Sequence, residues 1–282
     1  MQSNSRTATL IITLTLTAMI CAQAETRKEL RFKVGHHATV SITNQYGPIS
    51  VRPATGREVV VIATLASNKV EIDQSQRGNR IDVVSHLLSD ADANSGHVAY
   101  EVLVPPNASI VLHATAGQLR AEKMNGNVDF EDATGDVDVR DFSGAHLHIK
   151  TLDGPVTLTN IQDGYVEITS TGGDVVMKAV SGPMIEVNSV SGRISYDGDF
   201  GAGGEYVLTS HTGDIEALAP AYASIDVFAR SVNGMVENDF TLEPEHTPFM
   251  MKAGSAFAGT VNKAASRVKL LSFSGKIHLK KR

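Results

Sequence analysis

The sequence predicts an all-β fold, a single-chain parallel β-solenoid, and three observations carry this prediction. Glycine recurs every nine or ten residues through the middle of the chain, which is typical of a stacked repeat. Runs that alternate apolar and polar residues follow these glycines, as expected for strands with one buried face. No segment after residue 24 has the 3.6-residue period of an amphipathic helix.

The repeat unit is defined by its glycine and by the apolar residues around it. The sequence that follows the glycine recurs, as in Gly135-Asp-Val-Asp-Val and Gly173-Asp-Val-Val-Met. An apolar residue often stands two positions before the glycine, at Met124, Phe142, Leu152, Val180, Val190, Val232 and Phe273. Because the period is two, we expect the glycine and these apolar residues to share the buried face. An inward glycine suits a tight corner in which a side chain has no room.

The glycines divide into two series with a spacing near 19 residues, which predicts a coil of two strands and two turns. One series is Gly117, Gly135, Gly154, Gly173, Gly192 and Gly213, and the other is Gly126, Gly144, Gly164 and Gly182. Roughly six coils stacked in parallel, 4.8 Å apart, would make a rod on the order of 30 Å long. The main alternative is an antiparallel sandwich, which would show hairpin signals such as Asn-Gly and uneven loops.

Segments on both sides of the repeat complete the expected organisation. We expect a signal peptide over residues 1–24, an irregular β cap over 25–115, solenoid repeats over 116–240, and an irregular segment with a closing strand over 241–282. Residues 25–282 are expected to form one continuous domain. Short strands are expected in the cap at 30–34, 38–42, 49–51, 59–63, 81–84, 100–104 and 110–112, with a polar loop at 89–96. The closing strand is expected at 268–279.

Stacking of the coils predicts which side chains lie above one another. One inward column should contain Val128, Leu147, Val166 and Ile185, and a second should contain Phe130, Ile149, Ile168 and Val187. This alignment needs a one-residue slip after Gly144, which Ala145 supplies. Between these columns an outward column should contain Asp129, His148, Glu167 and Glu186. In the other series the outward column should contain Arg120, Asp138, Thr157, Val176, Ser195 and Glu216.

The column of Asp129, His148, Glu167 and Glu186 is the most site-like pattern in the sequence. An imidazole between two carboxylates would be favoured in its charged form, and such a set could hold a divalent metal. The alternative is an ordinary solvated face on which a histidine relieves acidic repulsion. We expect the alternative, so no catalytic, cofactor or metal site is predicted and the column is kept only as a weak candidate.

Other chemical motifs are weak or missing. The Gly-Asp pairs at 135–136, 173–174 and 213–214 are similar to parts of calcium-binding nonapeptide repeats, but the regular second glycine and aspartate of those repeats are absent. Aspartate also favours turns, which is the simpler interpretation. The pair His36-His37 is expected in a turn, and His146 with His148 gives only two ligands on one face. The sequence contains no nucleophile elbow, phosphate loop or His-Glu-x-x-His motif.

The N-terminus and the composition indicate export. Arg6 precedes an apolar run from Ala8 to Cys21, and Ala22-Gln23-Ala24 fits a signal-peptidase site. The alternatives are an uncleaved anchor and a lipid attached at Cys21. Cleavage would remove Arg6 and the single cysteine, leaving 24 basic and 31 acidic residues. We therefore expect a protein of the periplasm, cell surface or medium, with no nucleic-acid partner and no stable membrane span.

Three stretches in order resemble a bacterial family of "putative adhesin" domains of unknown function. They are the opening from Phe32 to Val51, the segment Val102-Leu-Val-Pro-Pro-Asn-Ala-Ser-Ile110, and the Gly-x-Val-x-Val ladder that ends at Gly275-Lys-Ile-His-Leu279. The resemblance covers nearly all of the expected mature chain. It implies a β-solenoid in the cell envelope, without an assigned reaction, and it supplies no functional residues.

These observations lead to three hypotheses of function. The first is a non-enzymatic binding module for an unidentified surface ligand, a protein or a glycan, that needs no cofactor. The second is a carbohydrate-active enzyme that uses the face of Asp129 and Glu186. The third is an envelope scaffold that associates end to end, which cap-like termini would oppose.

Overall fold

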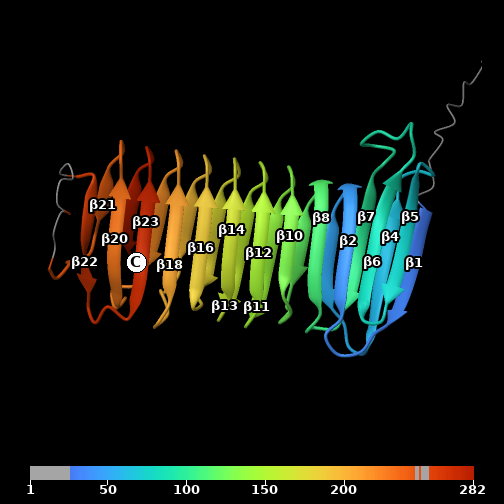
Figure 1. Cartoon of the computed structure of the whole chain (residues 1–282), viewed down its shortest axis with the longest axis horizontal. Coiled ribbons are helices and arrows are strands. Elements are labelled where there is room, and N and C mark those ends of the chain that lie inside the picture. The colour runs from blue at the N-terminus through green and yellow to red at the C-terminus, as the bar shows by residue number, and fades with distance from the viewer. Residues whose placement is uncertain (1–25, 245–247, 249–253) are drawn as a thin grey trace, which may run out of the picture.

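The computed structural model of the chain describes residues 26–244, 248 and 254–282. These residues form 24 strands, arranged as two twelve-stranded sheets that we call sheet A and sheet B. The two sheets run the length of an elongated molecule (Figure 1). No helix occurs in the described ranges. The expected all-β solenoid is confirmed, whereas the expected signal peptide at 1–24 lies outside the described residues.

The strand order differs from the sequence order only near the two ends of the stack. Sheet A runs β1 (Thr26–Lys33), β4 (Glu58–Leu65), β7 (Val98–Val104), β3 (Ile49–Pro53), β9 (Leu119–Glu122), β11 (Val137–Ser143), β13 (Val156–Gln162), β15 (Val175–Val180), β17 (Ile194–Asp197), β19 (Ile215–Ala219), β24 (Ile277–Lys281), β21 (Val236–Asn238). Sheet B runs β22 (Ala256–Val261), β20 (Ile225–Ser231), β23 (Ser266–Ser272), β18 (Glu205–Ser210), β16 (Met184–Ser189), β14 (Tyr165–Ser170), β12 (His146–Thr151), β10 (Val128–Asp132), β8 (Ser109–Ala116), β2 (Thr39–Tyr46), β6 (Arg80–Leu87), β5 (Val70–Arg77).

Each central coil places one strand in sheet B and the next in sheet A. Val128 of β10 pairs in parallel with Leu147 of β12, which pairs in turn with Val166 of β14. In sheet A, Val137 of β11 pairs in parallel with Val156 of β13. The predicted 19-residue coil is therefore confirmed in these central coils, as are the two inward columns and the two outward columns.

The parallel stack is longer than the glycine pattern indicates, because both flanking regions join it. Strands β2, β3 and β8 of the expected cap already pair in parallel with their neighbours. Twelve strands at a spacing of about 4.8 Å make a stack on the order of 50 Å long. Antiparallel pairs occur at both ends: at the N-terminal end β1 pairs with β4, β4 with β7 and β5 with β6, and at the other end β20 pairs with β22. The sequence did not indicate β5, whose second half is polar and exposed.

At each end of the stack, one coil lies between coils that are distant from it in sequence. The coil of β2 and β3 lies between the β6–β7 coil and the β8–β9 coil. The coil of β23 and β24 lies between the β18–β19 coil and the β20–β21 coil, as Figure 1 shows for β23. The expected closing strand at 268–279 is thus a complete coil inside the stack. The strands of these two coils, which are the first and last coils in the sequence, are therefore hydrogen-bonded to a neighbouring strand on both edges.

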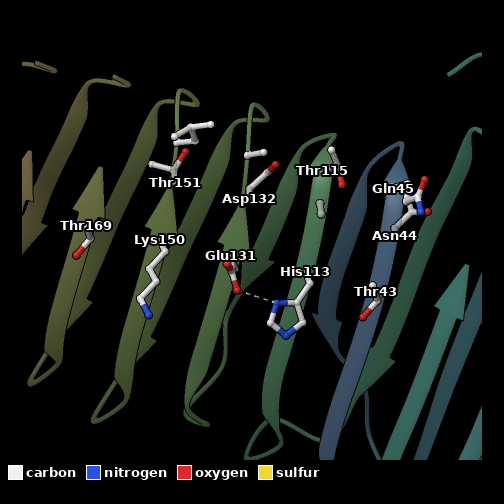
Figure 2. Close-up of a pocket in the computed structure, with 13 residues that line it drawn as sticks. Thr43, Asn44, Gln45, His113, Thr115, Glu131, Asp132, Lys150, Thr151 and Thr169 are labelled. Carbon is white, nitrogen blue, oxygen red and sulfur yellow. Dashed lines mark ion pairs between the residues drawn. The ribbon is translucent and has the colours of Figure 1, made fainter. Parts of the chain in front are cut away.

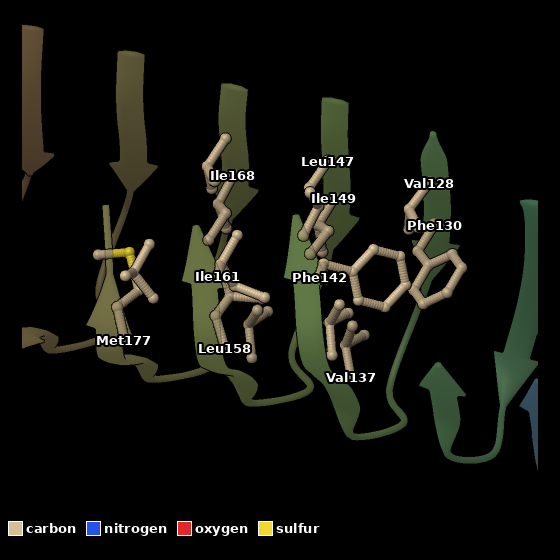
Figure 3. Packing of buried hydrophobic residues seen from close by; sticks show 14 of the residues in the cluster. Val128, Phe130, Val137, Phe142, Leu147, Ile149, Leu158, Ile161, Ile168 and Met177 are labelled. Carbon is tan, nitrogen blue, oxygen red and sulfur yellow. The ribbon is translucent and has the colours of Figure 1, made fainter. Parts of the chain in front are cut away.

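The core is the space between the sheets, filled by inward side chains of successive coils. Figure 3 shows Phe130 and Phe142 side by side, with Val137 beneath them and Ile149 and Leu158 in the adjoining coil. These five side chains are at most 1% exposed. A side chain buried this fully stabilises the fold by about 1.5–3 kcal/mol relative to its exposed state. Stacking is therefore what makes each short strand stable, since a single coil has no core of its own.

The corner that leads from sheet B to sheet A carries a buried polar ladder, which we call the serine corner. Its residues stand three positions before the corner glycine: Asp132, Thr151, Ser170, Ser189, Ser210, Ser231 and Ser272, all buried. Gly154 N–H donates to Thr151 Oγ1 at 3.0 Å, and that hydroxyl donates to the Gly154 carbonyl at 3.1 Å. Each hydroxyl can thus satisfy backbone groups inside the turn, where water has no access.

The corner that leads from sheet A to sheet B contains a left-handed residue, and we call it the bulge corner. Asp141, Asn160 and Ala179 have φ of 57°, 55° and 52°. Asp and Asn tolerate this region better than most residues, and Asn160 Nδ2 donates to Asp141 Oδ1 at 2.6 Å. The extra residue shifts the alternation of the strand, so that Phe142, which follows Asp141, points inward.

The expectation that apolar residues two positions before the glycine are buried is wrong at the serine corner. At the bulge corner Met124, Phe142 and Val180 are buried, but at the serine corner Leu152, Val190, Val232 and Phe273 are 46–56% exposed. The reason is the alternation itself. The serine-corner strand has no bulge, so a buried residue three positions before the glycine leaves the next residue facing solvent.

Candidate functional site

The outward column predicted from the sequence exists on the outer face of sheet B. His148 Nδ1 lies 3.1 Å from Asp129 Oδ1, and His148 Nε2 lies 3.9 Å from Glu167 Oε1. Glu186 is the next residue of the column and accepts a hydrogen bond from Asn188 Nδ2 at 2.9 Å. The structure therefore brings all four predicted residues into one row, with the imidazole bridging two carboxylates on neighbouring strands.

The row is open to solvent, which limits its chemistry. The side chains of Asp129 and Glu167 are 53% and 59% exposed, and that of His148 is 34% exposed. Exposed ion pairs of this kind contribute about 0–1 kcal/mol. In residues 26–244, 248 and 254–282, no group of three His, Cys, Asp or Glu side chains is placed to hold a metal ion. The geometry fits an acidic strip on a surface.

The corresponding outward column of sheet A is a set of paired charges. Asp138 is 7% exposed and lies 2.7 Å from Arg140 Nε. Arg120 contacts Glu122 at 3.1 Å and Asp138 at 4.0 Å. Next to these charges, the column continues through Thr157 and then uncharged residues of β15 and β17. Asp138 thus pairs with Arg140 along β11 and with Arg120 across to β9, although Arg120 Nε has no hydrogen-bond partner, so most of the charge at this end of the column is already paired.

A hollow of about 600 Å³ lies on the outer face of sheet B, two residues along the strands from the predicted column. Figure 2 shows its outward side chains standing on successive strands, and they are Thr43, His113, Glu131, Lys150 and Thr169. His113 Nδ1 lies 3.3 Å from Glu131 Oε2. No carboxylate of the described ranges forms an ion pair with Lys150. The hollow thus presents an ammonium group, a carboxylate, an imidazole and two hydroxyls along one line.

Two buried side chains of the adjoining corner also line this hollow. Asn44 Nδ2 donates to the carbonyls of Tyr46 and Val98 at 2.9 and 2.8 Å, but its Oδ1 has no partner. Asp132 Oδ1 accepts the N–H groups of Thr134 and Gly135 at 3.2 Å, while its Oδ2 is also unpartnered. Burial raises the pKa of Asp132 above its usual range. Both residues line the hollow, but their two unpartnered oxygens are buried beneath its surface.

This hollow was not identified from the sequence, although the predicted strand register already placed Glu131 and Lys150 side by side on the outer face. The column of Glu131 and Lys150 follows Asp129 and His148 by two residues and so had to face the same way. Its mixed charges made no recognised catalytic or metal pattern. The depth of the hollow depends on the corner, where the small residues Ala114 and Ala133 leave space. That space could not be inferred before the serine corner was known.

The remaining candidate residues serve the backbone. Asp174 Oδ1 accepts the N–H of Arg193 at 2.8 Å, and Asp214 Oδ1 accepts that of Lys276 at 2.7 Å. These Gly-Asp aspartates therefore link successive coils, as turn residues do. His37 has a φ of 57°, typical of a turn. The ring of His146 packs on Tyr165, with 4.6 Å between ring centroids.

No helix within the described ranges is long and apolar enough to cross a membrane.

Solved structures from three bacteria are similar to this chain at low sequence identity. A solved structure from Bacteroides fragilis, described as a putative adhesin, is 14% identical; 92% of this chain and 99% of that chain are covered, with a TM-score of 0.44. One from Parabacteroides merdae with the same description is 7% identical, with 90% and 96% covered and a TM-score of 0.41. A putative cell adhesion protein from Clostridium sporogenes is 12% identical, with 91% and 100% covered and a TM-score of 0.30.

A search of curated proteins finds no relative of this chain. The profile of the family described as Toastrack DUF4097, in contrast, matches residues 37–280. The match begins just before β2 and ends within β24, so that it includes almost every coil of the stack. This chain belongs to the Toastrack DUF4097 family.

Proposed function

We propose that the protein is an exported, non-enzymatic binding module, and that it holds a hydroxyl-rich surface ligand, a glycan, in the hollow on the outer face of sheet B. The observation that carries the proposal is the row of Glu131 and Lys150 with hydroxyls at both ends, along the wall of the hollow. Sugar hydroxyls both donate and accept hydrogen bonds, so they match a wall that alternates acceptors and donors.

The position of the hollow supports this function. It lies on a rigid face that successive β-ladders hold in place, so little order has to be gained on binding. The acidic strip of Asp129, His148, Glu167 and Glu186 lies alongside and would favour a neutral or cationic ligand over a polyanion. A linear ligand lying across the strands would meet a new side chain about every 4.8 Å.

A non-enzymatic role is supported by the state of the carboxylates. Glycosidases use a pair of carboxyl groups flanking the scissile bond, one with a raised pKa in a desolvated pocket. Glu131 and Glu167 are exposed, at 65% and 59% of their side-chain surface. Asp132 has a raised pKa, but both its carboxyl oxygens are turned into the corner, with Oδ1 bound to the turn.

The test is a glycan array probed with the chain from Glu25 to Arg282. We expect binding of a neutral or amino-containing glycan, and we expect the double variant Glu131→Gln/Lys150→Ala to lose at least tenfold in affinity, equivalent to about 1.4 kcal/mol. The matched control is Lys178→Ala, a lysine at the corresponding outward position of sheet A. Recovery of the protein outside the cytoplasm with Glu25 at its N-terminus tests export.

Four outcomes contradict the proposal. Equal binding by the double variant would move the site away from the hollow, and loss of binding in Lys178→Ala would move it to sheet A. Release of reducing ends from the bound glycan would contradict the non-enzymatic role. Absence of any glycan ligand, with capture of one purified envelope protein instead, would contradict the ligand class.

A further inference from the structure

The outer face of sheet B changes character at its C-terminal end. Across β12, β14 and β16 the second outward column is polar, with Lys150, Thr169 and Asn188. On β18, β23 and β20 the same column continues as Thr209, Leu271 and Arg230. The row beside it, at the serine corner, is already apolar at Leu152 and Val190, and it remains so at Phe273 and Val232. This part of the face therefore combines apolar groups with a guanidinium.

A second hollow, of about 360 Å³, lies at this place. Its wall includes Phe273 and Val232, which are 46% and 47% exposed. The rings of Phe273 and His211 stack with centroids 4.8 Å apart and an interplanar angle of 12°. Leu271 and Arg230 complete the wall. Hollows of 300–1,000 Å³ are the size of small-molecule sites, and adjoining exposed apolar groups mark contact surfaces.

Arg230 is the charged group of this hollow, and its guanidinium forms no ion pair within the part of the chain that the structure describes. No carboxylate of the described ranges forms an ion pair with it, whereas seven other arginines do: Arg31, Arg52, Arg80, Arg120, Arg140, Arg267 and Arg282. The carboxylate of Glu205, on β18 beyond β23, already lies 3.9 Å from both Arg267 and Lys269. The charge at the hollow is therefore positive and uncompensated.

We propose that this second hollow binds an amphipathic anion, a carboxylate or sulfate carried on an aliphatic body. The guanidinium of Arg230 presents a planar fork of donors that matches two oxygens of such a group. The aliphatic part lies over Phe273, Val232 and Leu271 and removes their exposed surface from water. Charge complementarity thus selects the head and the apolar wall selects the body. The site is separate from the polar hollow on β8, β10 and β12, and it stands if the glycan proposal fails.

The experiment titrates the chain from Glu25 to Arg282 with three probes below micelle-forming concentration, by calorimetry and by amide NMR. The probes are octanoate, its neutral counterpart octanamide, and acetate, which has the charge without the chain. We expect octanoate to bind at least tenfold more tightly than either of the others, since both parts of the site contribute. The shifted amides should belong to β18, β20 and β23.

Variants locate the site without disturbing the core. Arg230→Gln keeps a polar side chain but shortens it and removes the charge, and should reduce octanoate affinity about tenfold to the level of octanamide. Phe273→Ser should reduce the binding of octanoate and octanamide together. The matched control is Leu152→Ser, an exposed apolar residue at the same position of another coil, which should bind octanoate as the unchanged protein does. Equal affinity for octanoate and octanamide, unchanged binding by Arg230→Gln, or no saturable binding would each overturn the proposal.

Discussion

The two corners of the coil solve the same problem with different chemistry. Both must turn a strand from one sheet to the other without leaving buried backbone groups unpaired. The serine corner uses a buried hydroxyl three residues before the glycine, as at Ser170, whose Oγ donates to the Gly173 carbonyl at 2.8 Å. The bulge corner uses a left-handed residue such as Asp141 and then buries an apolar side chain, Phe142.

The comparison teaches that one sequence position can have opposite environments in alternate turns. Val180 and Val190 each stand two residues before a glycine, yet Val180 is fully buried and Val190 is 49% exposed. The apolar ridge at the serine corner is therefore a surface, and it borders both hollows through Leu152 and Phe273. The bulge corner, in contrast, contributes its apolar residues to the core.

The largest expected difference concerns the corner glycines. A Cβ on Gly154 would lie 1.7 Å from the Gly135 carbonyl oxygen of the neighbouring coil, whereas a Cβ on Gly144 would meet nothing within 4 Å. Gly144 has a φ of +64°, so Gly144→Ala is expected to cost only the left-handed strain of about 1–2 kcal/mol. Gly154→Ala should cost more than about 4 kcal/mol, because two backbones must separate. Urea unfolding of both variants measures this, and equal midpoints would contradict the close stacking of the serine corner.

A smaller difference is expected for the two valines. Val180→Ala removes two buried methyl groups and leaves a small cavity, so a loss of about 2 kcal/mol in the free energy of unfolding is expected. Val190→Ala should change it by less than about 0.5 kcal/mol, as usual for exposed positions. The pair is matched in residue type and in distance from the glycine. Similar losses in thermal or urea unfolding would show that the two corners do not differ in this way.

The fold was predictable because, in a stack of coils, residues that are one repeat apart in the sequence lie side by side on neighbouring strands. Once the 19-residue coil was recognised, the pairings of Asp129 with His148 and of Asp138 with Thr157 followed. The order of the end coils was not predictable. Nothing in the sequence of β23 and β24 indicates that their coil lies between β18–β19 and β20–β21 in the stack, since any coil of the right period can pair with any other.

The candidate sites were less predictable than the fold, because they depend on depth. Outward columns could be assigned from the alternation of side chains along each strand. A hollow, however, forms only where small side chains lie beside large exposed ones. In the first hollow the small side chains are those of Ala114 and Ala133, and the large exposed ones are corner residues such as Leu152. The corner residues were expected to be buried. Asp132 also escaped notice because its seven-residue ladder is recognised only when the buried position three before the glycine is known.

The smallest expected effect concerns Asp132, which occupies a serine-corner position where the neighbouring coils carry Thr151 and Ser170. Its Oδ2 is buried without a partner, and burial raises its pKa. A carboxyl whose folded-state pKa is raised favours the fold when protonated, so this stabilisation is complete below its ordinary pKa and is lost as pH rises through the raised value. Asp132→Ser should therefore stabilise the protein by about 1 kcal/mol at neutral pH, and this gain should shrink on acidification.

Urea unfolding between pH 4 and 8 measures the difference between the Asp132→Ser variant and the unchanged protein, with the exposed Asp153→Ser as the control. A gain that does not depend on pH would mean that Asp132 is not titrating in the folded state. A loss at neutral pH would mean that the carboxylate holds the turn better than a hydroxyl does. In that case the main contribution of the buried residue at the serine corner would be to accept the N–H of the corner glycine. Asp132 Oδ1 already accepts the N–H of Gly135 in this way.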